Sequence, residues 1–512
     1  EGLIETASVL GSEEVANGDF NNTSWWSVGT YWTIGDGFAT RSVVGSQANY
    51  SLSRASLLTI GKSYEVVISI DSIASGSVSV ILGATNGDLY TTSGTYTFRG
   101  ICSSSTTFKI SPSGDFNGSV DNVSVKEVIT SNIPRIDYSN GCGSLLLEKQ
   151  STNLITYSED FSNAAWTKTN VTISANSTTS PDGTTNADKI VADSGSSIKL
   201  AYQVLSSTNG VAHSAFAFYK ADEYSYAFLR IGGQSPSPYV IYDLTSQSIV
   251  STANATSTSI ENYGNGWYKV SMTYTTNSTT NAPNVSFLPT SGYTLDSLNQ
   301  PVYNGDGVSG GYIYGAQLEQ SSYPTSYIIS NSGTTTTRIQ DSSSTTGLSS
   351  VINSTEGVLF VEMAALSGDG TNKILSLTDG NGINNGRVAI YYNTSGDVIG
   401  QLYDGTNVVN LSYTPSDTTV FLKIAFKYKS GDYAFWINGV EVATSTFAYT
   451  ILPNTLSVLD FDDGTSSNDF YGNVQNLMVF PSALTDEQLT DLTGTVHQTF
   501  NSLATFYNYT IL

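Results

Sequence analysis

A chain of 512 residues is too long for one hydrophobic core, so we expect three or four domains. Its net charge of −23, from 43 acidic and 20 basic residues, argues against nucleic acid or an anionic membrane as a partner, because both attract basic surfaces. Few residues are charged, and Gly, Ser, Thr, Asn and Tyr are abundant, so the composition predicts an all-β protein.

The first predicted domain covers residues 1–130. Between the opening "EEVANGDF" and the closing "GSVDNVSVKEV" lie alternating runs such as "SYEVVISI", which are typical of short antiparallel strands. Residues 131–152 include "PRIDYSNGCGSLLLEKQ", which breaks the alternation and is interpreted as a packed connector. The second domain, residues 153–330, contains about eight strand candidates, enough for a two-sheet jelly roll.

A polar, low-complexity linker is expected at residues 331–350, and a third β-sandwich at residues 351–494. In that third domain, "YAFWINGVEV" predicts a hairpin with a type I′ turn at Asn438-Gly439. "SALTDEQLTDL" predicts a short helix capped by Thr485. The apolar tail, residues 495–512, suits either an oligomer contact or an extra strand on its own domain.

Other signals concern the compartment. No stretch of 18 apolar residues suggests a membrane span, and the start has no signal-peptide pattern, so we expect either a removed signal or another exit from the cell, such as a virion. Cys102 and Cys142 form no CxxC pair, so a cysteine zinc site is not expected. One disulfide and two buried free thiols both remain open.

Three stretches resemble known families. "VANGDFNN" with "GSVDNVSVKE" resembles carbohydrate-binding jelly rolls of the family 4/9/22 type, and "NLITYSEDFSNAAWTK" with "GAQLEQSSYPTSYI" resembles a second such module. "GVLFVEMAAL" with "YAFWINGVEV" and "GNVQNLMVFPSALTDEQLTDL" looks like a laminin-G or concanavalin-like sandwich. The series looks like virion-associated fibre or adhesin proteins of marine and flavobacterial phages. Such proteins are often trimeric, which implies a homo-oligomer. We interpret the first two domains as divergent copies of one jelly roll.

The resemblance also implies a structural calcium between the opening segment and the last strand of a jelly roll. In the first domain the matching positions are Asn17, Asp19 and Asp121. In the second domain they are Glu159, Asp160 and Glu319, where Gln317 departs from the pattern. The alternative is that these are solvated loop acids. For Glu159 and Asp160 in "NLITYSEDFSNAAWTK" we expect an architectural role first.

Aromatic side chains are the candidate sugar contacts, because flat rings stack on the C–H faces of sugars. Trp25, Trp26 and Trp32 cluster in "SWWSVGTYW", and Trp166 follows the "SEDF" segment. Since adjacent strand residues face opposite ways, we expect either Trp25 or Trp26 to be exposed. The alternative for any single Trp is core packing, which we expect for Trp267 and Trp436.

Catalytic signals are weak. His213 and His497 stand in no metal or nucleophile motif. "KYKSGDY" at residues 427–433 only partly matches a polysaccharide-lyase pattern, and strand alternation explains it equally well. A glycosidase needs two facing carboxylates, and no pair is indicated.

The sequence therefore favours a non-catalytic glycan-binding adhesin or virion fibre protein, located on a virion or outside the cell, whose partners are polysaccharides and other virion or surface proteins. The alternatives are a purely structural assembly protein with lectin-like folds and a secreted polysaccharide-degrading enzyme.

Overall fold

The protein is all-β, and the computed structural model describes every residue except 1–3, 6–8, 49, 130–133, 139–140, 332, 383–385 and 495–512. The chain divides into two compact units, which are taken separately below. The N-terminal unit spans Ala7–Ile133, and the C-terminal unit combines Glu1–Thr6 with Pro134–Leu512. Within the described residues, no helix is long and apolar enough to cross a membrane.

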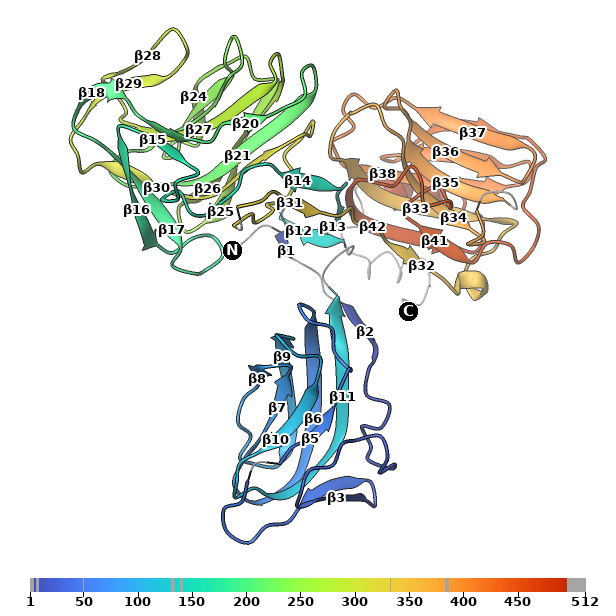
Figure 1. The fold of residues 1–512 in the computed structure, drawn as a ribbon. Helices are drawn as coiled ribbons and strands as arrows, with labels where there is room; N and C mark the ends of the chain where they lie inside the picture. Colours follow the sequence, from blue (N-terminus) through green and yellow to red (C-terminus); the bar gives the residue numbers. More distant parts are fainter. Residues whose placement is uncertain are drawn as a thin grey trace. The chain divides into compact units, whose positions relative to one another are not determined.

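The N-terminal unit is one β-sandwich, called the first sandwich (Figure 1). One sheet has the order β3-β4-β11-β6-β9, with β2 also pairing with β11, and it faces a sheet of order β5-β10-β7-β8. The strands are β2 (Val9–Glu13), β3 (Trp32–Gly35), β4 (Phe38–Arg41), β5 (Leu52–Arg54), β6 (Ser63–Ser75), β7 (Val78–Leu82), β8 (Thr85–Asn86), β9 (Gly94–Ile101), β10 (Phe108–Pro112) and β11 (Asn117–Ile129).

Strict alternation in β6 explains the shape of the first sandwich. Tyr64, Val66, Ile68 and Ile70 are buried in one core, whereas the residues between them face the other side. Cys102 is also buried here and donates a hydrogen bond to the Ser105 carbonyl oxygen. Both cysteines are free thiols, so the disulfide alternative is wrong. Cys142 is exposed, so the alternative of two buried thiols holds only for Cys102.

The second sandwich belongs to the C-terminal unit and is built from two large sheets. One sheet has the order β16-β17-β30-β21-β26-β25, and the other β15-β19-β27-β22-β23-β24, with β20 also pairing with β27. A smaller sheet has the order β18-β29-β28. The strands are β15 (Thr167–Thr169), β16 (Val171–Thr178), β17 (Ala187–Ala192), β18 (Gly195–Ile198), β19 (Leu200–Tyr202), β20 (Leu205–Ser206), β21 (Ala212–Ala221), β22 (Tyr226–Gly232), β23 (Tyr239–Asp243), β24 (Ser248–Ala253), β25 (Ser257–Gly264), β26 (Trp267–Thr275), β27 (Thr280–Leu288), β28 (Tyr293–Leu295), β29 (Pro301–Gly305) and β30 (Gly310–Glu319).

The third sandwich also lies in the C-terminal unit. Its outer layer of order β32-β41-β34-β35-β36-β37 packs on a sheet that contains β42-β33-β38-β39-β40 (Figure 1). The elements are β32 (Ser344–Thr345), η1 (Leu348–Ser350), β33 (Glu356–Ala365), β34 (Lys373–Thr378), β35 (Arg387–Tyr392), β36 (Val398–Tyr403), β37 (Val408–Tyr413), β38 (Leu422–Lys429), β39 (Tyr433–Ile437), β40 (Val440–Ser445), β41 (Val458–Asp460), β42 (Gly472–Phe480) and α1 (Asp486–Thr493).

Local predictions in the third sandwich are confirmed. Asn438 and Gly439 both have positive φ, as a type I′ turn requires between β39 and β40. Thr485 caps α1, and Gln488 completes a capping box. Helix α1 covers Trp436, which is buried, as is Trp267 in the second sandwich, so both are core residues as expected. The predicted tail at residues 495–512 and His497 lie outside the described residues.

The segments that precede and follow the second sandwich in the chain contain strands as well as connectors. β12 (Arg135–Asp137) and β13 (Ser144–Leu147) extend the sheet of β42, and β1 (Ile4–Glu5) pairs with β12. β14 (Ser151–Asn153) pairs with β31 (Thr336–Arg338), which falls inside the segment expected to be a polar linker. The hydroxyl groups of Thr152 and Thr337 also bond across this pair. Composition alone misses the pairing because its partner is distant in the sequence.

Buried charges join these connecting segments. The Arg135 Nη2 atom lies 2.6 Å from Glu148 Oε2 and 2.5 Å from Asp341 Oδ2, and Arg338 Nη1 lies 2.9 Å from the same Glu148 oxygen. Burial alone would raise the pKa of Glu148, but Arg338 and Arg135 outweigh it and hold that pKa below its usual value. The carboxylate is therefore ionised, and the cluster fixes the connector and the 331–350 segment to each other.

Candidate functional site

The openings of the first and second sandwiches share a local lock. Trp26 Nε1 donates to the carbonyl oxygen of Asn17 at 3.0 Å, and Trp166 Nε1 donates to that of Tyr157 at 3.0 Å. Each indole lies nine positions after its acceptor. Each also packs against the Phe of its opening segment, Phe20 or Phe161. The two openings therefore share this local arrangement, and the interpretation of the two sandwiches as divergent copies stays a prediction.

Three of the four predicted sugar-stacking tryptophans are core residues. Trp26, Trp32 and Trp166 are buried, with exposed fractions of 4%, 5% and 1%. We therefore correct their assignment as sugar contacts, because a buried ring offers no face to a ligand. Trp25 is half-buried: its ring lies beside Trp26 and under the Arg54 guanidinium, 4.9 Å from the ring centroid. The expectation that one of the adjacent pair faces outward holds only in part.

The predicted metal ligands of the second sandwich are satisfied by hydrogen bonds. Glu319 is fully buried and accepts hydrogen bonds from Ser151, Ser214 and Thr325, the last through both its N–H and its hydroxyl. Because a carboxylate has about four acceptor positions, these donors leave no room for a cation. Glu319 therefore does not fit a calcium site.

Glu159 and Asp160 also have protein partners. Glu159 accepts from the Tyr314 hydroxyl at 2.6 Å and from Asn331 Nδ2 at 2.7 Å. Asp160 accepts from the Ser162 hydroxyl and the Asn163 backbone, and these bonds outweigh burial to lower its pKa. Both acids fix the opening segment, as expected for an architectural role.

The predicted ligands of the first sandwich have fewer donors. Asn17 is buried and exchanges hydrogen bonds with the Asn22 backbone, Asp19 accepts from Asn21, and Asp121 accepts from Asn122. A bond from Val123 N to the Gly18 carbonyl brings the opening and closing segments together. Among the residues the structure describes, no three His, Cys, Asp or Glu side chains converge. Calcium in this sandwich stays a prediction.

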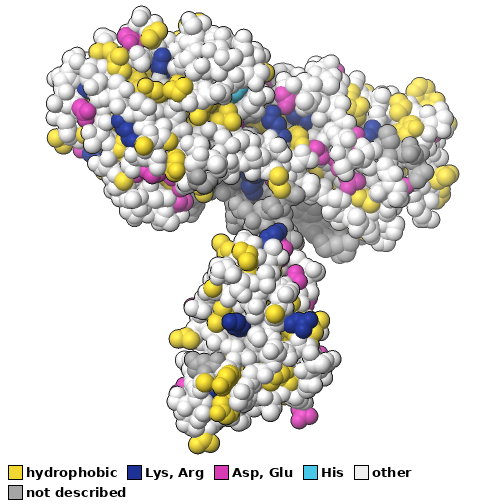
Figure 2. Space-filling model, in the orientation of Figure 1, with side chains coloured by type: hydrophobic (Ala, Val, Ile, Leu, Met, Phe, Trp, Pro, Cys, Tyr) yellow, Lys and Arg dark blue, Asp and Glu magenta, His cyan; other side chains and the backbone are white. Residues whose placement is uncertain are grey.

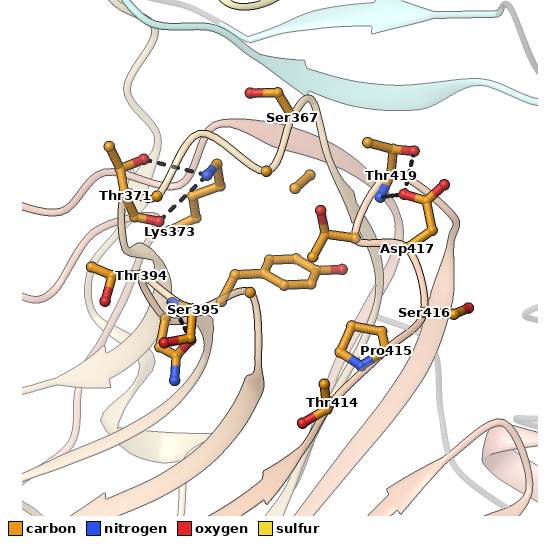
Figure 3. A pocket seen from close by; sticks show the side chains of 17 residues that line it. Ser367, Thr371, Lys373, Thr394, Ser395, Thr414, Pro415, Ser416, Asp417 and Thr419 are labelled. Atoms are coloured by element: carbon orange, nitrogen blue, oxygen red, sulfur yellow. Dashed lines mark hydrogen bonds between the residues drawn. The ribbon is translucent and has the colours of Figure 1, made fainter.

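A pocket of about 400 Å³ opens at one end of the third sandwich (Figure 3). Its wall is formed by three loops, which join β33 to β34, β35 to β36 and β37 to β38. Eight of the lining residues are serines or threonines: Ser367, Thr371, Thr394, Ser395, Thr414, Ser416, Thr418 and Thr419. The volume lies within the range typical of small-ligand sites.

Each wall loop is fixed by an Asp or Asn side chain that accepts the backbone N–H two residues later. Asp369 accepts from Thr371 N at 3.2 Å, Asn393 from Ser395 N at 2.8 Å, and Asp417 from Thr419 N at 2.8 Å. Such turns hold short loops without regular structure. None of the patterns considered in the sequence indicated this site, although the tripeptides "DGT", "NTS" and "DTT" carry its signal.

Charges in the pocket are engaged with neighbouring groups. Lys373 is buried and its Nζ lies 2.6 Å from Asp369 Oδ1 (Figure 3 shows its bonds to Thr371). Burial would raise the pKa of Asp369, but hydrogen bonds from Lys373 and Thr371 lower it overall. Hydrogen bonds from Thr419 lower the pKa of Asp417. Both carboxylates are therefore ionised at neutral pH, and neither is a proton donor.

A polar row crosses the outer face of the third sandwich. Arg387 donates to Gln401 at 2.5 Å, and Gln401 donates to Asn410 at 2.9 Å, so the row joins β35, β36 and β37. Arg387 also donates to the Asp463 carbonyl oxygen, and Tyr391 lies beside Gln401. This row is a second polar surface on the same sandwich.

In the second sandwich, a further hollow of about 480 Å³ lies beside His213, whose pKa is lowered by burial.

Comparison with known proteins gives likeness of fold only. No family model and no curated protein matches the chain. Among solved structures, the CBM40 of Ruminococcus gnavus IT-sialidase matches at 21% identity over 28% of this chain and 84% of its own, with a TM-score of 0.25. A pentraxin from Limulus polyphemus matches at 15% identity over 28% and 76%, with a TM-score of 0.24. Sheep galectin-11 matches at 13% identity over 27% and 94%, with a TM-score of 0.18.

Proposed function

We propose that the chain is a non-catalytic glycan-binding protein that takes a neutral saccharide in the pocket of the third sandwich. The observation that carries the proposal is a sugar-sized pocket walled by eight hydroxyl side chains on three fixed loops. Hydroxyl groups both donate and accept, so they match the hydroxyls of a sugar.

The charges support a neutral ligand. Lys373 and Asp369 form a buried ion pair, which leaves no free cation among the described lining residues to attract a carboxylated or sulfated sugar. Asp417 adds one negative charge at the wall. An acidic saccharide would therefore meet repulsion rather than a partner.

The carboxylates support binding rather than cleavage. A glycosidase acid needs a raised pKa to give its proton at neutral pH. The pKa values of Asp369 and Asp417 are lowered instead. The alternative, a polysaccharide-degrading enzyme, is tested by measuring the release of new reducing ends or unsaturated products from polysaccharide.

The biological setting we propose is adhesion, on a virion or another extracellular assembly, with several copies of the chain presenting shallow sites together. Linked sites raise effective concentration, which offsets modest affinity at each site. A purely structural role is the alternative, and the charge cluster of buried Arg135, Glu148 and Asp341 with partly buried Arg338 is the feature that favours it, because it makes a stiff joint.

The proposal is tested by a substitution that fills the pocket. Ser416 is exposed on the wall, so Ser416→Trp should fill the opening without disturbing the core. The matched control is Ser430→Trp, at an exposed serine of the same sandwich outside the pocket. Retention of the full chain on a panel of neutral polysaccharides should fall with Ser416→Trp and persist with Ser430→Trp. Equal retention by both variants would show that this pocket is not the site.

A further inference from the structure

Two tyrosine rings stand exposed together in the first sandwich, one just before β3 and one just before β5. Tyr31 is 41% exposed and Tyr50 46%, and their ring centroids are 6.3 Å apart at an interplanar angle of 49°. In Figure 2, hydrophobic side chains are scattered over the visible face of this unit, including its lower end. The rings form a shallow, open angle, which is called the Tyr31–Tyr50 platform below.

Buried side chains hold the platform in place. Trp32 Nε1 donates to the Tyr50 carbonyl oxygen at 2.7 Å, and fully buried Arg41 donates to the Ala48 carbonyl oxygen at 3.1 Å. Arg41 also anchors to the Phe116 carbonyl oxygen at 2.7 Å. Ordering cost on binding is small where side chains are already fixed.

Close approach of Tyr50 depends on a glycine. A Cβ atom at Gly29 would lie 2.9 Å from Tyr50 Cβ, which is too close for van der Waals contact. Tyr31, in turn, has φ of +75°, a backbone conformation that a bulky aromatic residue rarely adopts. Such strain persists only where the surroundings impose it, and it concentrates at functional positions.

A polar group stands beside the rings. The Tyr31 hydroxyl donates to Gln47 Oε1 at 2.9 Å, and Gln47 N donates to the Gly114 carbonyl oxygen at 2.9 Å. The guanidinium of Arg41 lies 5.8 Å from the Tyr31 ring, but it is buried and bonded to carbonyl oxygens. The platform thus offers ring faces and a neutral amide rather than an exposed cation.

We propose that the Tyr31–Tyr50 platform is a second glycan-binding site, which stacks the C–H face of one pyranose residue on its rings while Gln47 bonds a ring hydroxyl. The class of ligand rests on the function proposed above, whereas the site is separate from the pocket of the third sandwich. One chain would then hold a polysaccharide at two places, and the pair would gain affinity by linkage.

The substitution Tyr31→Gly removes the ring and also relieves the strained backbone, because glycine adopts positive φ freely. A purely structural Tyr31 would make the variant less stable, whereas a ligand-binding Tyr31 leaves its melting temperature unchanged or higher. Tyr31→Phe keeps the ring and loses only the bond to Gln47. Leu89→Ala, at an exposed apolar residue of the same sandwich, is the matched control.

Binding is measured with the full chain carrying Ser416→Trp, so that the platform is observed without the pocket, on the neutral polysaccharide that retains the wild-type chain best. We expect this protein to retain some binding. Adding Tyr31→Gly should weaken that binding about tenfold or more, whereas Tyr31→Phe should largely keep it and Leu89→Ala should leave it unchanged. A marked fall in the melting temperature of Tyr31→Gly would overturn the proposal.

The two proposals fail in different ways. Loss of all retention on Ser416→Trp alone would overturn the platform and leave the pocket standing. If Ser416→Trp leaves retention unchanged and Tyr31→Gly abolishes it, the proposed role of the pocket is overturned and that of the platform is supported. A wild-type chain that no polysaccharide retains would overturn both.

Discussion

Trp32 donates its indole hydrogen bond to the backbone carbonyl of Tyr50, 18 positions along the chain, at 2.7 Å. The indole itself is buried in the core of the first sandwich. The bond therefore ties the hydrophobic core to the backbone of a residue whose ring is exposed. A cluster of aromatic residues in a sequence does not show which side chains pack in the core and which face solvent, whereas here Trp32 packs in the core and the Tyr50 ring faces solvent.

We predict that Trp32→Ala destabilises the N-terminal unit by about 3–5 kcal/mol, because it leaves a cavity and an unpaired carbonyl. Trp25→Ala should cost clearly less, since Trp25 is half-buried. Denaturant unfolding followed by tryptophan fluorescence measures both. Equal costs would contradict the assignment of Trp32 to the core.

The second sandwich should lose stability in acid through Asp182. Burial would raise the pKa of this carboxyl, but hydrogen bonds from Ser180, Thr184 and Tyr314 outweigh it and lower the pKa to about 2. The unfolded value is about 3.9, so the stabilisation is fully present above that pH and is lost as the pH falls toward 2. The gap in melting temperature between wild type and Asp182→Asn should therefore shrink from pH 6 to pH 2.5. A constant gap would contradict the shift.

Calcium in the first sandwich remains a separate prediction. Asp121 oxygens accept hydrogen bonds only from Asn122 among the described contacts, so they retain acceptor positions for a cation. If calcium binds there, a chelator should lower the melting temperature, because a ligand of the folded state stabilises it. The substitution Asp121→Ala should remove that sensitivity. An unchanged wild-type melting temperature in chelator would rule this site out.

Glu148→Gln should destabilise the C-terminal unit by about 3–5 kcal/mol, because it leaves buried Arg135 and partly buried Arg338 against a neutral group. Arg338 lies in β31 and is ion-paired, so trypsin should spare it in the wild type and cut after it in the variant. Glu441→Gln, at an exposed acid, is the control. Early cleavage at Arg338 in the wild type would contradict a fixed joint.

Local signals in the sequence predicted more of the fold than of the site. The alternation of β6, the turn at Asn438-Gly439 and the cap at Thr485 are each specified within a few residues, and the structure has them. Pairings such as β14 with β31 could not be predicted, because nothing near either strand identifies a partner so far away. Composition therefore indicated a linker where the chain forms a strand.

The candidate sites show the same limit. An aromatic residue in a sequence can serve either a core or a ligand, and only burial decides between them. Trp26, Trp32 and Trp166 are buried, whereas Tyr31 and Tyr50 of the same region as Trp26 are exposed. The pocket in the third sandwich gathers hydroxyls from three loops, and each loop alone is an ordinary polar turn.

The central claim is that the chain binds neutral glycans without cleaving them. Its most direct test passes the full wild-type chain over immobilised neutral and acidic polysaccharides and assays the eluate for new reducing ends and unsaturated products. We predict retention on at least one neutral polysaccharide, weaker retention on its acidic counterparts, and no products. Absence of retention on every polysaccharide, or release of products, would contradict the account.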